Sequence, residues 1–368
     1  MPAAIARLRL AVCRNSWNAV ALLAVLLLLV GAADLGRAAT AESFGGIVAI
    51  DLAGRQTRLT AGVNPAVARD GRIAFITGDL NVMEADGHNA RVVANGAAGG
   101  ISFADDLEWS QASWSPRGDM IAFDGEYEAV PPPLCLQHCA GWAVRAIGSD
   151  GSGLKQIALN ARAPAWSPDG DHIAFESGAG GPDLGGASGV TIARPDGSGA
   201  VTVHAFNRFN GVGPVWSPSG RELAFQGQQT DGGPFWIYVV RADGTRKRRL
   251  ARGHNPTWSP DGRRVAFIRD YKLISIGRDS RGRRRLSRDG EFVIAEAWSP
   301  NGRTIAYLAG TSGYGGSAAT NLRLRIVTAD GKRAQTLARD SSSVRLCGFC
   351  TTPAWTPDGK RILVVESP

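Results

Sequence analysis

Residues 258–267 read WSPDGRRVAF, and five close copies of this segment recur along the chain. Each copy holds a tryptophan, a Ser-Pro or Thr-Pro pair, one variable residue and a glycine, followed by an apolar stretch. The six copies begin at Trp114, Trp166, Trp216, Trp258, Trp298 and Trp355. A seventh, degenerate copy (VARDGRIAF) begins at Val67. Neighbouring copies are 40 to 57 residues apart, a period typical of propeller blades.

Each copy predicts a β-hairpin with a tight turn. Proline fixes φ near −65° and glycine accepts the positive φ that closes such a turn, so Ser-Pro-Asp-Gly is turn chemistry. One strand should end at the tryptophan, and the apolar stretch should form the second strand. The continuity of the apolar residues predicts that both strands are largely buried. The repeated aspartates (Asp169, Asp261 and Asp358) are then turn residues and not catalytic acids.

A second kind of hairpin alternates with the first and turns mostly at Asp-Gly, as in IYVVRADGTRKRRL at 237–250. There are seven hairpins of each kind, and the chain starts with the second kind (47–60) and ends with the first (353–366). The sequence therefore predicts an all-β fold, a seven-bladed β-propeller of four-stranded antiparallel blades. The N-terminal hairpin should complete the C-terminal blade and close the ring, which removes exposed sheet edges.

The first 41 residues have the features of a targeting segment. Arg7, Arg9 and Arg14 precede an apolar run at 19–33, and Ala39-Thr40-Ala41 fits a cleavage site. The run is shorter than the roughly 20 residues that span a bilayer upright. A cleaved signal peptide and a retained signal anchor both remain open, and both predict an extracytoplasmic protein. The predicted domains are residues 1–41, the signal, and residues 42–368, the propeller.

The repeat resembles that of the TolB-type β-propeller family, W-S-P-D-G-x-x-I-A-F, over residues 46–368. The resemblance implies a propeller fold. TolB itself has six blades after a small α/β domain, whereas this sequence predicts seven blades and no such domain. Only the propeller type therefore carries over, and a fold alone does not define a function.

The predicted topology gives the ring two different faces. The tight turns within both kinds of hairpin share one face, which we call the tight face. The longer connections share the opposite face, which we call the loop face. Because variable loops on a rigid scaffold often carry function, we expect the loop face to bind an envelope protein or a glycan.

Four cysteines fall in predicted loop-face segments: Cys135, Cys139, Cys347 and Cys350. In an exported chain, disulfides are the first interpretation, and the two local pairs are favoured among three connectivities. A zinc site that includes His138, or a redox role for the CGFC segment at 347–350, remains open as an alternative.

Basic residues concentrate between Arg241 and Arg288, where sixteen Lys or Arg oppose four Asp, while the whole chain carries +8. Two runs should lie on outer strands: Arg246, Lys247, Arg248 and Arg249, and then Arg283, Arg284 and Arg285. They could bind anionic lipid or wall polymer, or simply keep exposed strand edges from aggregating. Nucleic acid is not expected for an exported chain without interleaved aromatic residues.

The sequence as a whole favours a non-enzymatic, monomeric binding or assembly module of the cell envelope, with no catalytic residue, metal or cofactor. It holds no G-x-S-x-G nucleophile motif. The alternative is a metal-dependent carbohydrate-active enzyme, a lyase or hydrolase with a site in the central channel. Of the five histidines, His138, His204 and His254 are the candidates for such a site. Acidic residues such as Asp124, Glu126 and Glu128 could hold Ca²⁺ but are expected to be solvated charges.

Overall fold

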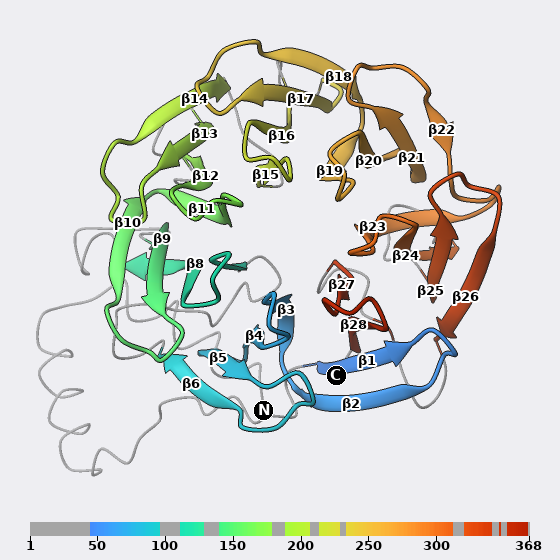
Figure 1. The fold of residues 1–368 in the computed structure, drawn as a ribbon, viewed down its shortest axis with the longest axis horizontal. Coiled ribbons are helices and arrows are strands. Elements are labelled where there is room, and N and C mark those ends of the chain that lie inside the picture. Colours follow the sequence, from blue (N-terminus) through green and yellow to red (C-terminus); the bar gives the residue numbers. More distant parts are fainter. Residues whose placement is uncertain are drawn as a thin grey trace, which may run out of the picture. The chain divides into compact units, whose positions relative to one another are not determined.

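The computed structural model describes residues 45–95, 111–128, 140–178, 188–206, 213–228, 233–311, 320–340, 346 and 352–366. Within these ranges the regular elements are 28 β-strands, which form seven four-stranded antiparallel sheets. The sheets stand around a common axis like propeller blades, as the view down that axis shows (Figure 1). The predicted seven-bladed, all-β propeller is confirmed. A search of the same ranges finds no helix suited to crossing a membrane.

We number the blades 1 to 7 along the chain, and each runs from an inner strand near the axis to an outer strand at the rim. The strands, from inner to outer, are β3 (Val63–Val67), β4 (Ile73–Ile76), β5 (Leu80–Met83) and β6 (Arg91–Ala94) in blade 1; β7 (Ala112–Trp114), β8 (Met120–Glu128), β9 (Ala140–Gly148) and β10 (Lys155–Leu159) in blade 2; β11 (Ala161–Trp166), β12 (Ile173–Ser177), β13 (Ser188–Ala193) and β14 (Val201–Phe206) in blade 3; β15 (Val215–Trp216), β16 (Glu222–Gly227), β17 (Trp236–Arg241) and β18 (Arg248–Arg252) in blade 4; β19 (His254–Trp258), β20 (Arg264–Arg269), β21 (Lys272–Gly277) and β22 (Arg284–Arg285) in blade 5; β23 (Phe292–Trp298), β24 (Thr304–Thr311), β25 (Thr320–Thr328) and β26 (Ala334–Arg339) in blade 6; and β27 (Ala354–Trp355), β28 (Arg361–Glu366), β1 (Gly46–Asp51) and β2 (Gln56–Ala61) in blade 7.

Blade 7 closes the ring with strands from both ends of the described chain. β1 pairs antiparallel with β28, with Ile47 opposite Val365 and Ile50 opposite Ile362. The blue β1 and β2 accordingly lie beside the red β27 and β28 in Figure 1. The predicted closure by the N-terminal hairpin is therefore confirmed.

The repeated turn is held by its serine or threonine hydroxyl. In blade 5 the Ser259 hydroxyl donates to Asp261 Oδ1 (2.6 Å) and accepts from the Arg264 backbone N–H (2.9 Å). Gly262 takes a φ of +66°, which suits glycine best. The hydrogen bond from Ser259 holds the pKa of Asp261 below its usual value. The repeated aspartates thus act as turn residues, as the sequence indicated.

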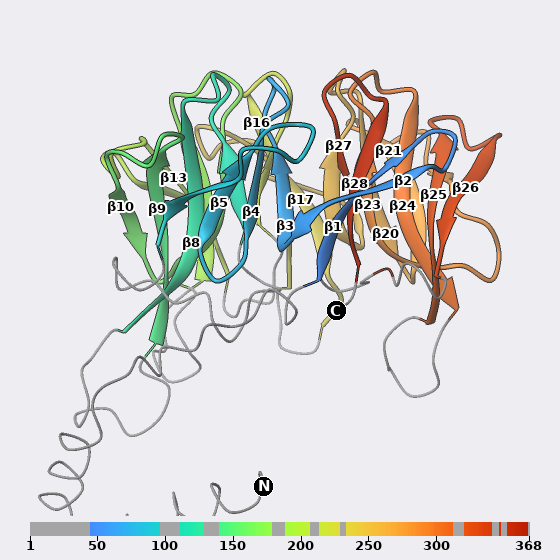
Figure 2. The same ribbon diagram turned by 90° about the horizontal axis from the view of Figure 1, so that it is seen from below.

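The two kinds of tight turn lie side by side on one face. The Arg278 N–H, in the outer turn of blade 5, donates to the Arg263 carbonyl in its inner turn (2.9 Å). The same pairing joins Ala242 to Arg221 in blade 4. These turns form the upper edge of the ring in Figure 2, which confirms the predicted tight face.

The inner strands are less buried than the sequence predicted. The central part of β20 is buried (Val265–Ile268), whereas β19 alternates between buried and half-buried residues. The prediction that both strands are largely buried was therefore wrong for the inner strand. The reason is geometric: an inner strand packs against its neighbours but turns alternate side chains toward the central channel.

Three of the six repeat tryptophans form hydrogen bonds to the preceding blade. Trp114 donates its indole N–H to the Ala66 carbonyl (3.0 Å), Trp216 to Ala165 (3.0 Å), and Trp355 to Ala297 (3.1 Å). Each acceptor lies on the inner strand of the preceding blade. Trp114, Trp298 and Trp355 also belong to the buried apolar clusters between blades. Their role is structural.

Two of the repeat tryptophans allow the contribution of this hydrogen bond to stability to be measured. Trp355 and Trp298 are both 8% exposed, but the Trp298 indole N–H has no acceptor within the described residues. Trp355→Phe should therefore lower the free energy of unfolding by about 1 kcal/mol more than Trp298→Phe, since both lose similar packing and only the first loses a hydrogen bond. Urea denaturation of both variants measures the difference, and equal losses would contradict it.

Candidate functional site

The two predicted basic runs lie at the rim of the ring. Arg248 and Arg249 are on β18, with Arg246 and Lys247 in the turn before it. Arg284 and Arg285 form β22, and Arg283 precedes it. All but Arg248 are exposed. The predicted placement on outer strands is therefore confirmed for four of the seven residues, whereas the other three lie just before those strands. Their role as a binding surface stays a prediction.

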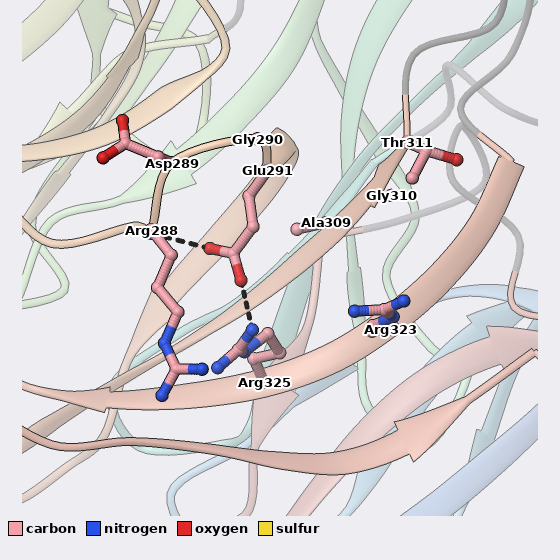
Figure 3. Close-up of a pocket in the computed structure, with 9 residues that line it drawn as sticks. All are labelled: Arg288, Asp289, Gly290, Glu291, Ala309, Gly310, Thr311, Arg323 and Arg325. Atoms are coloured by element: carbon pink, nitrogen blue, oxygen red, sulfur yellow. Dashed lines mark hydrogen bonds and ion pairs between the residues drawn. The ribbon is translucent and has the colours of Figure 1, made fainter.

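An arginine-lined cavity of about 230 Å³ opens on the loop face of blade 6. Its walls come from three places: the connection between β22 and β23, the end of β24, and β25 (Figure 3). The lining residues are Arg288, Asp289, Gly290, Glu291, Ala309, Gly310, Thr311, Arg323 and Arg325. We call this cavity the first pocket.

Glu291 organises the first pocket. Its carboxylate forms an ion pair with Arg325, accepts the Tyr307 hydroxyl (3.1 Å) and accepts the Arg288 backbone N–H (2.9 Å). Arg325 is buried, and its Nε has no hydrogen-bond partner within the described residues. Burial, and then the neighbouring Glu291 charge, raise the pKa of Tyr307. This ion pair thus lines the first pocket with most of its hydrogen-bonding groups already paired.

Two arginines of the first pocket keep their charge free for a ligand. The side chains of Arg288 and Arg323 form no ion pair within the described residues, whereas Asp289 is paired with Arg285 (2.6 Å). In Figure 3 the Arg288 guanidinium lies beside that of Arg325. A planar guanidinium offers two parallel donors to a carboxylate or phosphate, so this arrangement suits an anion.

A second cavity of about 420 Å³ adjoins the first one on blade 5, and we call it the second pocket. It is lined by Arg269, Asp270, Lys272, Ile274, Arg283 and Arg285. Two contacts join the walls of the pockets. The Lys272 ammonium donates to the Glu291 carbonyl (2.7 Å), and Arg285 pairs with Asp289. Together the two pockets carry seven basic and three acidic residues.

Only part of this site was predictable from the basic runs of the sequence. Arg283 and Arg285 were named, but Arg323 and Arg325 were not. The signal was present in the segment LRLRI at 322–326, because alternation in a strand places both arginines on one face of the sheet. The register confirms this placement, with Arg325 opposite Tyr307 and Arg323 opposite Ala309.

A buried glutamate lies in the same cross-strand row. Glu296 is opposite Tyr307, which is in turn opposite Arg325. Glu296 is 3% exposed, and neither of its carboxyl oxygens has a hydrogen-bond partner within the described residues. Burial raises the pKa of Glu296 well above its usual value. Five other blades carry proline at the matching position, two residues before the repeat tryptophan or its substitute: Pro65, Pro164, Pro214, Pro256 and Pro353.

Glu296 should therefore destabilise the fold in a pH-dependent way. The unfolded chain releases this proton near pH 4.5, whereas the folded protein retains it, so stability falls as pH rises above that value. We expect Glu296→Leu to gain about 2 kcal/mol of unfolding free energy at pH 8 and little at pH 4. Denaturation at the two pH values measures this, and a pH-independent difference would contradict it.

Asp124 differs from the sequence-based expectation. It was expected to be a solvated charge or a Ca²⁺ ligand, but it is fully buried. Its carboxylate accepts the Gln111 N–H (2.5 Å) and the Ala163 N–H of the next blade (2.6 Å). Burial raises its pKa to about 6, and these hydrogen bonds oppose the shift. The expectation was wrong because the residue joins two blades.

The residues considered for metal binding or disulfides are placed only in part. Cys135, Cys139, Cys347, Cys350 and His138 lie outside the described residues. Burial and, second, the nearby Lys247 lower the pKa of His204, in blade 3, to about 4. His254 lies on the inner strand of blade 5. No three His, Cys, Asp or Glu of the described ranges gather in a way that could hold a metal ion.

A wider cavity of about 540 Å³ opens on the tight face, where the inner strands of blades 1 to 5 end. It is lined by small apolar residues, by the turn residues and by four of the repeat tryptophans. Arg69 is the one charged residue in its lining. This mouth of the central channel therefore offers few charged side chains to a ligand, whereas the two loop-face pockets offer many.

These observations define the class: a seven-bladed propeller with two adjoining basic pockets on blades 5 and 6. No family model and no curated protein matches the chain. Solved structures do match it. A putative TolB from Agrobacterium tumefaciens is 16% identical with a TM-score of 0.55, covering 88% of this chain and 98% of that one.

Two enzymes share the fold as well. An oligogalacturonate lyase in complex with manganese is 16% identical with a TM-score of 0.54, over 74% of this chain and 79% of that one. A Mycobacterium tuberculosis puromycin-hydrolysing peptidase is 18% identical with a TM-score of 0.57, over 84% of this chain. This chain covers about half of the peptidase (53%). At these identities the likenesses establish the fold alone.

Proposed function

We propose that this protein is a non-enzymatic binding module that takes an anionic ligand of the cell envelope on its loop face. The observation that carries the proposal is the cleft formed by the first and second pockets. It brings seven basic side chains together over two cavities, and its acidic residues are already paired with some of them. A rigid ring that holds such a cleft can bind without moving.

The proposed location is extracytoplasmic, and it rests on the signal-like residues 1–41. In that compartment, surface glycans, wall polymers and acidic protein segments present carboxylates or phosphates. Arginine binds these groups in the planar, two-point manner that gives specificity as well as attraction. The rim arginines of β18 would add long-range attraction that salt screens.

The alternative function, a metal-dependent carbohydrate-active enzyme, lacks a supporting observation among the described residues. One solved structure of this fold is a lyase that holds manganese. In this chain, however, His204 and His254 lie on different blades, and neither lines the two basic pockets. We therefore propose binding rather than catalysis.

The purified chain can be tested against immobilised envelope polymers of known charge at low and moderate salt. The cleft variant carries Arg288→Glu and Arg323→Glu. A matched variant carries Arg246→Glu and Arg249→Glu, which changes the total charge equally at the rim. We expect the cleft variant to lose binding at moderate salt while the rim variant retains it. Equal losses in both variants would contradict a specific site on the loop face.

A further inference from the structure

A strained tyrosine stands at the loop-face end of blade 5. β20 and β21 are joined by a two-residue turn of Asp270 and Tyr271, with Arg269 opposite Lys272. Both turn residues have positive φ, 48° for Asp270 and 57° for Tyr271. Asparagine, aspartate and glycine enter this conformation readily, but a bulky aromatic residue is an outlier there. Such strain concentrates at functional sites.

The tyrosine ring is exposed and at the same time held in place. Tyr271 is 49% exposed, and it is the one aromatic among the exposed large hydrophobic residues of the described chain. Its ring stacks on Phe292 with centroids 3.5 Å apart and an angle of 20°. Its carbonyl accepts the Val293 N–H (2.9 Å). One face of the ring is thus supported by protein.

Tyr271 is connected to residues of both pockets. Its chain neighbours Asp270 and Lys272 line the second pocket. Its stacking partner Phe292 follows Glu291, which lines the first pocket. The ring itself lines neither pocket, but its chain neighbours and its stacking partner connect it to the walls of both.

We infer that the cleft binds an acidic oligosaccharide, with one pyranose ring stacked on Tyr271. Carboxylates of the neighbouring sugar units would meet Arg288 and Arg323 in the first pocket, and Arg269, Lys272 and Arg283 in the second. This inference rests on the proposed function and gives its ligand a chemical class. The apolar C–H face of a sugar can stack on the amphipathic tyrosine ring, and the guanidinium groups can donate hydrogen bonds to the sugar carboxylates.

An aromatic platform distinguishes this ligand from other polyanions. A polyphosphate chain carries the charge but has no ring to stack. Arginines alone would bind it, so a strained, exposed tyrosine would have no role. Basic side chains in two pockets, together with the exposed ring of Tyr271, match the charge and the ring faces of an acidic oligosaccharide.

The test uses the full chain and calorimetric titration with three kinds of probe at moderate salt. Tetramers of galacturonate and of mannuronate carry rings and charge, their methyl esters carry rings alone, and tetrapolyphosphate carries charge alone. Tyr271→Asn removes the ring at a backbone position that suits asparagine, and Tyr271→Phe keeps the ring as a matched control.

We expect at least one uronate tetramer to bind the wild type at least about tenfold more tightly than its ester or tetrapolyphosphate. Tyr271→Asn should weaken the affinity for that tetramer alone by about tenfold, and Tyr271→Phe should keep the wild-type affinity. If tetrapolyphosphate binds as tightly as the uronate tetramer, or if Tyr271→Asn leaves the affinity unchanged, the oligosaccharide inference is wrong. The proposed binding of an anionic ligand is not contradicted by that result. If neither charged probe binds more tightly to the wild type than to the Arg288→Glu/Arg323→Glu variant, the proposed function fails as well.

Discussion

Replacing Ile50 by aspartate should lower the free energy of unfolding by roughly 4 kcal/mol or more. Ile50 is fully buried on β1, opposite Ile362 of β28, and packs in the cluster shared by blades 6 and 7. An unpaired carboxylate there loses its hydration and gains no partner. Because β1 holds the two ends of the ring together, the loss should appear as unfolding of the whole propeller, measured by guanidinium denaturation.

Leu52→Asp is the matched control for this prediction. Leu52 lies two residues further along the same hairpin and is 43% exposed. The same substitution there should change the unfolding free energy by no more than about 0.5 kcal/mol. If Ile50→Asp were equally mild, closure by the N-terminal hairpin would contribute little to stability.

Removing the Glu291 carboxylate by Glu291→Ala should cost about 3–5 kcal/mol of unfolding free energy. Its side chain is 12% exposed, and that of its ion-pair partner Arg325 is 6% exposed. The variant leaves the Arg325 charge buried without compensation, and the Tyr307 hydroxyl also loses its acceptor. Thermal and urea denaturation would both report the loss.

A control variant and a double variant test the cause of this loss. Asp289→Ala should cost less than about 1 kcal/mol, because Asp289 is 95% exposed in its pair with Arg285. The double variant Glu291→Ala/Arg325→Leu should lose clearly less than the sum of its single variants, because it buries no unpaired charge. Additive losses would show that the two side chains act independently.

The fold was predictable because its information is local and repeated. Each copy of the tryptophan repeat encodes its own turn, through the Ser259–Asp261 type of hydrogen bond and a glycine at positive φ. The order of the hairpins then determined how the ring closes. The burial of the inner strands was not predictable in the same way, since it depends on a channel that exists only after all blades assemble.

The candidate site was predictable only in part, because it depends on pairs of residues from different blades. Arg285 was recognisable as part of a basic run. Its contact between the walls of the two pockets, however, depends on its ion pair with Asp289 and on the conformation of the connection between β22 and β23. Asp124 looked like a solvated acid because the sequence does not show that it accepts a backbone N–H of the next blade. Tyr271 carries no distinctive motif, and its importance rests on a backbone angle.

The closure of blade 7 also determines when the ring can be completed during synthesis of the chain. Among the described strands, β1 is synthesised first and β28 last, and the partners Ile47 and Val365 are separated by nearly the whole propeller sequence. Until β28 arrives, β1 presents an unpaired edge that could add to another chain. Pairing of such distant segments is slow because a long loop must first close. A nascent chain would therefore depend on protection of its first hairpin until the last blade has emerged.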